Sequence, residues 1–214
     1  MAKRILPYRD YSEHDVVNLF ALDLSSANAA ALAAMTSAGS GDHDAGVVVK
    51  VSAGALPGDT PSTLATSGAL RDYLGASFSG VHIGFNAYPS NGMTVAPADG
   101  TETTLGITLR ETLAFDENGE KMLTYKQKLD EAQGVLPGQT VPVLTKGMVL
   151  LSADAFHVGG GVNAPALKDS LEVSGNTAGK LEVHGSGTVV GKVIAIGEES
   201  DNSSAKKYLC KLSF

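Results

Sequence analysis

Residues 141–214 form a series of short runs rich in Val, Ile and Leu, separated by Gly, Asn, Asp and Ser. The runs include Val141-Pro-Val-Leu, Gly187-Thr-Val-Val-Gly-Lys-Val-Ile-Ala-Ile and the closing Lys207-Tyr-Leu-Cys-Lys-Leu-Ser-Phe. Branched side chains pack well on a pleated sheet, and Gly permits tight turns between strands. Lys192, Lys206 and Lys211 interrupt the apolar runs, as expected where one face of a sheet meets water. The pattern predicts a mainly β protein, with one or two small antiparallel β-barrel or sandwich modules.

Composition agrees with this class and excludes several others. The chain has 214 residues, enough for one large domain or two small ones. Hydrophobic residues make up 43% and aromatic residues only 6%, with no Trp, so the core is expected to be aliphatic. The 25 glycines fit many turns and argue against a helical bundle.

Charge and cysteine content limit the expected partners and compartment. The net charge of −7 gives no overall basic excess of the kind that nucleic-acid binding needs, so no nucleic-acid partner is expected. No apolar run approaches the roughly 18 residues that cross a bilayer, and no secretory signal or membrane association is expected. Cys210 is the only cysteine, which excludes an intrachain disulfide; its place between Leu209 and Lys211 predicts a small buried hydrophobic residue.

The first 24 residues form a distinct unit, predicted to be an extended N-terminal arm. Pro7 fixes its own φ and disfavours helix at Leu6. Such an arm packs either on its own domain or on a neighbouring subunit, and the second alternative is favoured because Tyr and Arg are enriched at interfaces. The candidate interface residues are Ile5, Leu6, Tyr8, Arg9, Tyr11 and Phe20.

Three further segments follow the arm. Residues 25–46 are rich in Ala, Ser and Gly and predict a linker with one short helix. Residues 47–135 predict a first β-module and residues 136–214 a second one; the two are either related modules or halves of one sandwich. The expected elements of the first module are strands at 47–51, 80–89 and 104–110 and a hairpin at Asn118-Gly119. The strand at 104–110 and the one at 189–196 each carry a Gly near the start, which suggests an internal repeat.

No stretch has the spacing of a catalytic or metal site. Neighbouring strand residues point to opposite faces, so Glu13-His14-Asp15 and Asp42-His43-Asp44 are not expected to converge on a metal. The Gly185-Ser-Gly-Thr run precedes a strand, whereas a dinucleotide loop must open a helix. No acid stands at convincing spacing from the strand-associated histidines, which are His82, His157 and His184. We therefore expect no enzyme activity, cofactor or metal.

The C-terminal pattern resembles the capsid cement, or head decoration, proteins of tailed bacteriophages. The residues concerned are Leu136-Pro-Gly-Gln-Thr-Val-Pro-Val-Leu-Thr-Lys-Gly-Met-Val-Leu-Leu, the Gly-rich centre, Gly187-Thr-Val-Val-Gly-Lys-Val-Ile-Ala and the closing strand. The resemblance implies a virion structural protein, made in the host cytoplasm, that binds the outer capsid surface as a trimer. It would tie neighbouring major capsid protein subunits together, with the arm as the clamp.

Two alternatives stay open. One is a tail, baseplate or fibre-associated component. The other is a ligand- or glycan-binding β-sandwich, although glycan sites usually rely on exposed aromatic residues and this chain has no Trp and six Tyr. If the arm is the clamp, deletion of residues 1–24 is expected to abolish capsid binding and leave the β-domain folded.

Overall fold

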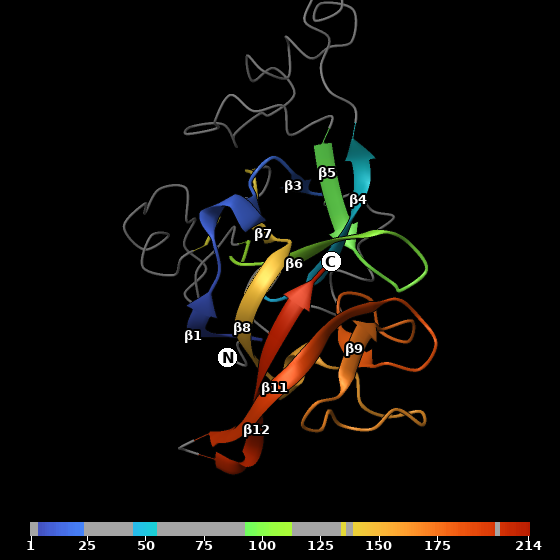
Figure 1. The fold of residues 1–214 in the computed structure, drawn as a ribbon. Helices are drawn as coiled ribbons and strands as arrows, with labels where there is room; N and C mark the ends of the chain where they lie inside the picture. The colour runs from blue at the N-terminus through green and yellow to red at the C-terminus, as the bar shows by residue number, and fades with distance from the viewer. Residues whose placement is uncertain (1–3, 24–44, 55–92, 113–133, 136–138, 200–201) are drawn as a thin grey trace, which may run out of the picture.

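The protein is mainly β, as the sequence predicts. The computed structural model describes residues 4–23, 45–54, 93–112, 134–135, 139–199 and 202–214, and within them the strands form two six-stranded sheets (Figure 1). Sheet 1 has the order β1 (Ile5–Asp10), β8 (Lys146–Ser152), β12 (Asn202–Ser213), β11 (Val189–Glu199), β9 (Ser170–Val173) and β10 (Leu181–Val183). Sheet 2 has the order β2 (Val16–Val17), β7 (Val143–Leu144), β6 (Thr104–Thr108), β4 (Val48–Gly54), β5 (Met93–Pro97) and β3 (Ala21–Leu22). Two 3-10 turns, η1 (Glu13–Asp15) and η3 (Ala153–Ala155), precede β2 and follow β8.

The two sheets share one aliphatic core. Leu151, Cys210 and Leu212 of sheet 1 lie in the same buried cluster as Val48 and Ile107 of sheet 2. A second cluster uses the opposite face of sheet 2, where a separate set of buried side chains packs together: Phe20, Leu22, Val47, Val49, Met93, Val95, Val135, Val141 and Val143. Sheet 2 is therefore apolar on both faces, so neighbouring residues of one strand, such as Val48 and Val49, are both buried.

Residues 4–23 contribute strands to both sheets. β1 pairs with β8, with Ile5 opposite Leu151, while β2 pairs with β7 and β3 pairs with β5. Of the two alternatives for the N-terminal segment, the structure shows packing on its own chain. The reason is that β8, β7 and β5 each offer an unpaired edge whose backbone groups the segment satisfies. The pairing of β3 with β5 is parallel, unlike the other pairings between the described strands.

The predicted boundary between residues 135 and 136 does not separate the sheets. β7, from the second predicted module, lies between β6 and β2 in sheet 2. Strands predicted as two modules thus contribute to one core. The Gly106 and Gly191 positions of the suggested repeat are both places of close approach: a Cβ on Gly191 would lie 2.7 Å from the Lys211 carbonyl oxygen, and one on Gly106 would clash with the Leu144 carbonyl.

Several smaller predictions are settled by the described residues. Cys210 is fully buried, and Lys192, Lys206 and Lys211 are exposed, as predicted. The strand expected from residue 47 is β4, and the one expected at 104–110 is β6. The predictions that lie outside the described residues are the helix in the linker, Asp42-His43-Asp44, the strand at 80–89 with His82, and the hairpin at Asn118-Gly119.

The β11–β12 ribbon extends past its neighbours, as Figure 1 shows at the lower end of the view. β8 pairs with β12 only from the Lys207–Ser152 pair onward, and β9 pairs with β11 only from Val189 to Lys192. The far half of the ribbon is therefore a two-stranded projection. The surface described next lies beside this projection, where β8, β12 and β11 pair side by side.

Candidate functional site: the outer face of sheet 1

Three strands of sheet 1 place an apolar row on the face that points away from the core. Leu209 on β12 lies opposite Leu150 on β8 and opposite Ala195 on β11. Side chains alternate between faces along a strand, and the flanking Tyr208 and Cys210 are buried in the core. The row therefore faces outward, with Leu150 and Leu209 half-buried and Ala195 exposed. We call Leu150, Leu209 and Ala195 the outer row.

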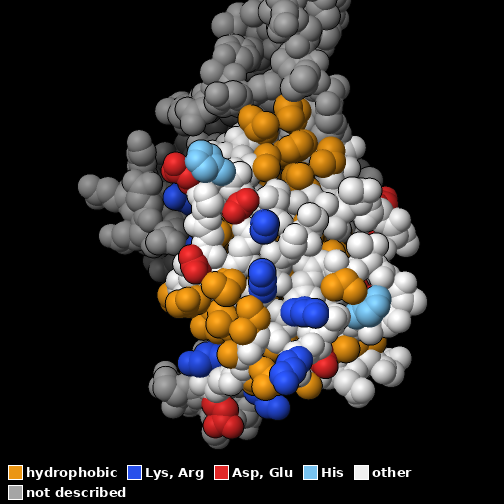
Figure 2. All heavy atoms as spheres, viewed as in Figure 1, with side chains coloured by type: hydrophobic (Ala, Val, Ile, Leu, Met, Phe, Trp, Pro, Cys, Tyr) orange, Lys and Arg blue, Asp and Glu red, His pale blue; other side chains and the backbone are white. Residues whose placement is uncertain are grey.

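Lysine side chains flank the outer row on both sides. On one side, exposed Lys211 lies opposite exposed Lys192; on the other, half-buried Lys207 lies opposite Ser152. Lys211 also lies opposite Met148 of β8, and Met148 in turn lies opposite Asp10 of β1. Figure 2 shows lysine and arginine side chains gathered among hydrophobic ones on the face where β8, β12 and β11 lie. A chain with a net charge of −7 thus carries a locally basic face.

A buried carboxylate pair lies on the β9–β10 hairpin. Glu172 and Glu182 are directly opposite each other, and each is only 7% exposed. Glu172 Oε2 accepts hydrogen bonds from His184 Nδ1 and from the Gly187 amide, both at 2.7 Å. Burial alone would raise the pKa of Glu172, but hydrogen bonds from the Gly187 amide, the His184 ring and the Gly185 amide hold it below its ordinary value.

Glu182 has partners of its own. Its Oε2 accepts hydrogen bonds from Ser174 Oγ at 2.7 Å and from Asn176 Nδ2 at 3.2 Å. The two carboxylates are thus occupied in holding the loops at either end of the hairpin, and we assign them a structural role. The sequence does not reveal the acid beside His184, because Glu172 lies on the neighbouring strand, β9. The contact becomes visible only when the alignment of β9 with β10 is known.

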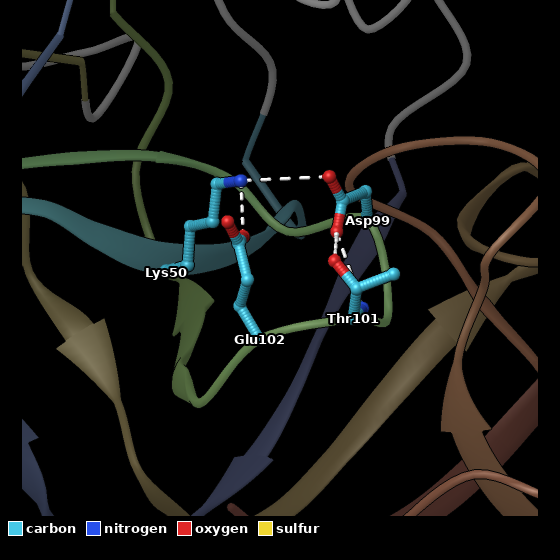
Figure 3. A network of polar contacts seen from close by, with 4 residues as sticks. All are labelled: Lys50, Asp99, Thr101 and Glu102. Carbon is cyan, nitrogen blue, oxygen red and sulfur yellow. Dashed lines mark hydrogen bonds and ion pairs between the residues drawn. The ribbon is translucent and has the colours of Figure 1, made fainter.

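A second polar cluster lies on the turn between β5 and β6 (Figure 3). Lys50 Nζ is 3.5 Å from Asp99 Oδ2 and also contacts the Glu102 carboxylate. Hydrogen bonds from the Thr101 hydroxyl and amide, together with the charge of Lys50, lower the pKa of Asp99. Both carboxylate side chains are almost half exposed, at 46% and 48%. An exposed cluster of this kind fixes a turn and contributes little to stability.

The six predicted interface residues fall into two groups. Ile5 and Phe20 are buried in the chain's own core, Tyr11 packs against that core, and Arg9 Nη1 donates to the Leu109 carbonyl at 3.3 Å. Half-buried Leu6 and Tyr8, which is 53% exposed, keep surface to offer a partner. The structure therefore does not bring the six residues together as one anchor.

In the described part of the chain, no group of three or more His, Cys, Asp or Glu side chains is placed to hold a metal ion. None of the helices described there is long and apolar enough to span a membrane. No protein-family model, curated protein or solved structure matches this chain. The outer row and its lysines are therefore the feature on which we base a functional proposal.

Proposed function

We propose that this protein is a virion structural protein that decorates the outer surface of a tailed-phage head and ties neighbouring major capsid protein subunits together. The observation that carries the proposal is the outer row, a partly exposed apolar strip with lysine side chains on both sides of it, on a protein that is acidic overall. The resemblance of the C-terminal strands to cement proteins supports the same class.

The layout of the face suits a protein partner with an acidic rim. Apolar contact at the centre supplies affinity, while complementary charges around it steer the encounter and select the partner. The outer row is small, so one copy is expected to bind weakly. Several attachments acting together, through a homo-oligomer on a repeating lattice, raise the overall affinity without new contacts.

The proposal is tested by co-sedimentation of the purified chain with DNA-free heads of the phage that carries it. We expect Leu209→Glu and Lys211→Glu each to weaken binding about tenfold or more, or ~1.4 kcal/mol. Leu19→Glu and Arg110→Glu change exposed residues next to β3 and β6 of sheet 2 and are the matched controls, expected to bind as the wild type does. Circular dichroism checks that each variant is folded.

Three results would overturn the proposal. The first is a wild-type chain that does not co-sediment with heads, and the second is a set of outer-face variants that decorate heads normally. The third is binding that free DNA competes away, because it would assign the lysines to phosphate contacts instead.

A further inference from the structure

The outer face of β12 carries a regular alternation of charged and apolar side chains. Lys207, Leu209 and Lys211 stand at every second position of the strand, so their side chains point to the same face. The residues between them, Tyr208 and Cys210, are buried in the core, so this face is the outer one. Successive side chains on one face of a strand are about 7 Å apart. β12 therefore presents a positive charge, an apolar group and a second positive charge at that interval.

The lysine charges on this face are not neutralised by acidic side chains of the described residues. Within that part of the chain, neither Lys207 nor Lys211 forms an ion pair. Lys211 lies directly opposite Lys192 of β11, and both side chains are exposed. Like charges directly opposite each other on one face destabilise a sheet. A carboxylate placed beside Lys192 and Lys211 would relieve their repulsion, so the face gains stability from an acidic ligand.

We infer that the outer face of β12 binds an extended segment of a partner protein in which an apolar residue stands midway between two acidic residues four positions apart. Its carboxylates lie at the levels of Lys207 and Lys211, and its apolar side chain lies on Leu209, because alternate residues of an extended segment have the same spacing as those of β12. Leu150 and Ala195, which lie opposite Leu209, widen the apolar contact. The inference rests on the proposed function, since it names the kind of segment that this face takes from the capsid protein.

The sequence indicates that the segment belongs to a different protein. In this chain only one pair of acidic residues is four positions apart, Asp116 and Glu120, and the residue midway between them is Asn118, which is polar. A second copy therefore lacks a segment with the required pattern. Nucleic acid is a poorer match, because its phosphate backbone has no apolar group to place on Leu209 and the net charge of −7 repels it at long range.

NMR titration of the full isotope-labelled chain with a synthetic peptide tests the inference. The peptide is a capped heptamer with Glu at its second and sixth positions, Leu at the fourth and Thr at the others. We expect it to shift the amide resonances of β12 and of the neighbouring strands, β8 and β11. Lys207→Glu and Lys211→Glu should each weaken its Kd about tenfold or more, because each sets a carboxylate against a carboxylate of the peptide.

Lys206→Glu is the matched control variant. It makes the same change of net charge on the same strand, but residue 206 alternates with Lys207 and so points to the other face. We expect it to bind the peptide as the wild type does. The double variant K207E/K211E should instead prefer a heptamer with Lys in place of both Glu residues.

A third heptamer, with its two Glu residues side by side at one end, tests the spacing and should bind the wild type about tenfold more weakly. The inference is overturned if the first peptide shifts no resonance of the outer face, if the three peptides bind the wild type equally, or if the double variant keeps the preference of the wild type. Larger shifts with inorganic pyrophosphate at equal ionic strength would also overturn it, because they would assign the lysines to phosphate groups.

Head binding is measured separately and distinguishes the two proposals. A chain that decorates heads but does not bind the acidic peptide contradicts only the inference about the segment. A chain that binds the peptide but does not decorate heads contradicts only the proposed function.

Discussion

Glu172 shows how a single buried charge holds a loop in place. Its carboxylate is only 7% exposed, and burial on its own would raise its pKa and favour the protonated form. Hydrogen-bond donors from the segment after β10 outweigh this effect of burial. Oε2 accepts hydrogen bonds from the His184 ring and the Gly187 amide, and these stabilise the charged carboxylate. The loop between β10 and β11 is therefore positioned by one oxygen atom.

Glu172→Gln is expected to lower the free energy of unfolding by about 1.5–3 kcal/mol at pH 7, the range for hydrogen bonds to a charged group. The folded pKa of Glu172 lies below its ordinary value of 4.5, so its contribution is present above pH 4.5 and is lost as the pH falls through the folded pKa. The difference between variant and wild type should therefore shrink in acid. Urea unfolding at pH 7 and near pH 3 measures this, with exposed Glu13→Gln as control; a constant difference would contradict it.

At the scale of elements, the N-terminal segment is part of the β-structure. Deletion of residues 1–24 would remove β1, β2 and β3 and take Ile5, Phe20 and Leu22 out of the two cores. The truncation is therefore expected to unfold the domain, which corrects the expectation that it would leave the domain folded. Point substitutions in β1 separate its contribution to the core from the contribution of its exposed side chains more cleanly than a deletion does.

Ile5→Ala is expected to cost about 2–5 kcal/mol of stability, because Ile5 is only 3% exposed and its truncation leaves a cavity. Tyr8→Ala on the same strand should change stability by less than about 0.5 kcal/mol, since Tyr8 is 53% exposed. Chemical denaturation of both variants measures the contrast. Equal losses would mean that β1 does not pack as described.

Much of sheet 1 could be predicted from the sequence, but the strands with which the N-terminal segment pairs could not. Alternation predicted that Lys192 and Lys211 face water and that Cys210 is buried, because those patterns lie within single strands. The pairing of Ile5 with Leu151 is set by which distant edge stays open, and no local pattern encodes it. Strands of two residues, such as β2 and β3, are too short to show a period.

The candidate site was missed for a related reason. Leu150, Leu209 and Ala195 come from three strands and form a row only in the observed register. The six predicted interface residues lie in one continuous segment instead, because continuity along the chain is what a sequence shows directly.

At the scale of the whole molecule, the reactivity of the Cys210 thiol reports on global unfolding. Burial raises the pKa of its thiol to about 12, and the residue is fully covered within the shared core. Thiolate is the reactive form, so labelling of the folded protein at pH 8 should be far slower than labelling in urea. Its rate in water is expected to rise as global stability falls, so Ile5→Ala should speed labelling much more than Tyr8→Ala does. Rapid labelling of the native wild type would contradict a closed core.

The double membership of the N-terminal segment has a consequence for biosynthesis. β1 and β2 are synthesised before their partner strands, β8 and β7, which lie more than a hundred residues further along the chain. Long-range pairing of this kind slows folding. Until β8 appears, Ile5 lacks its partner Leu151, so a residue that is made early is among the last to be buried.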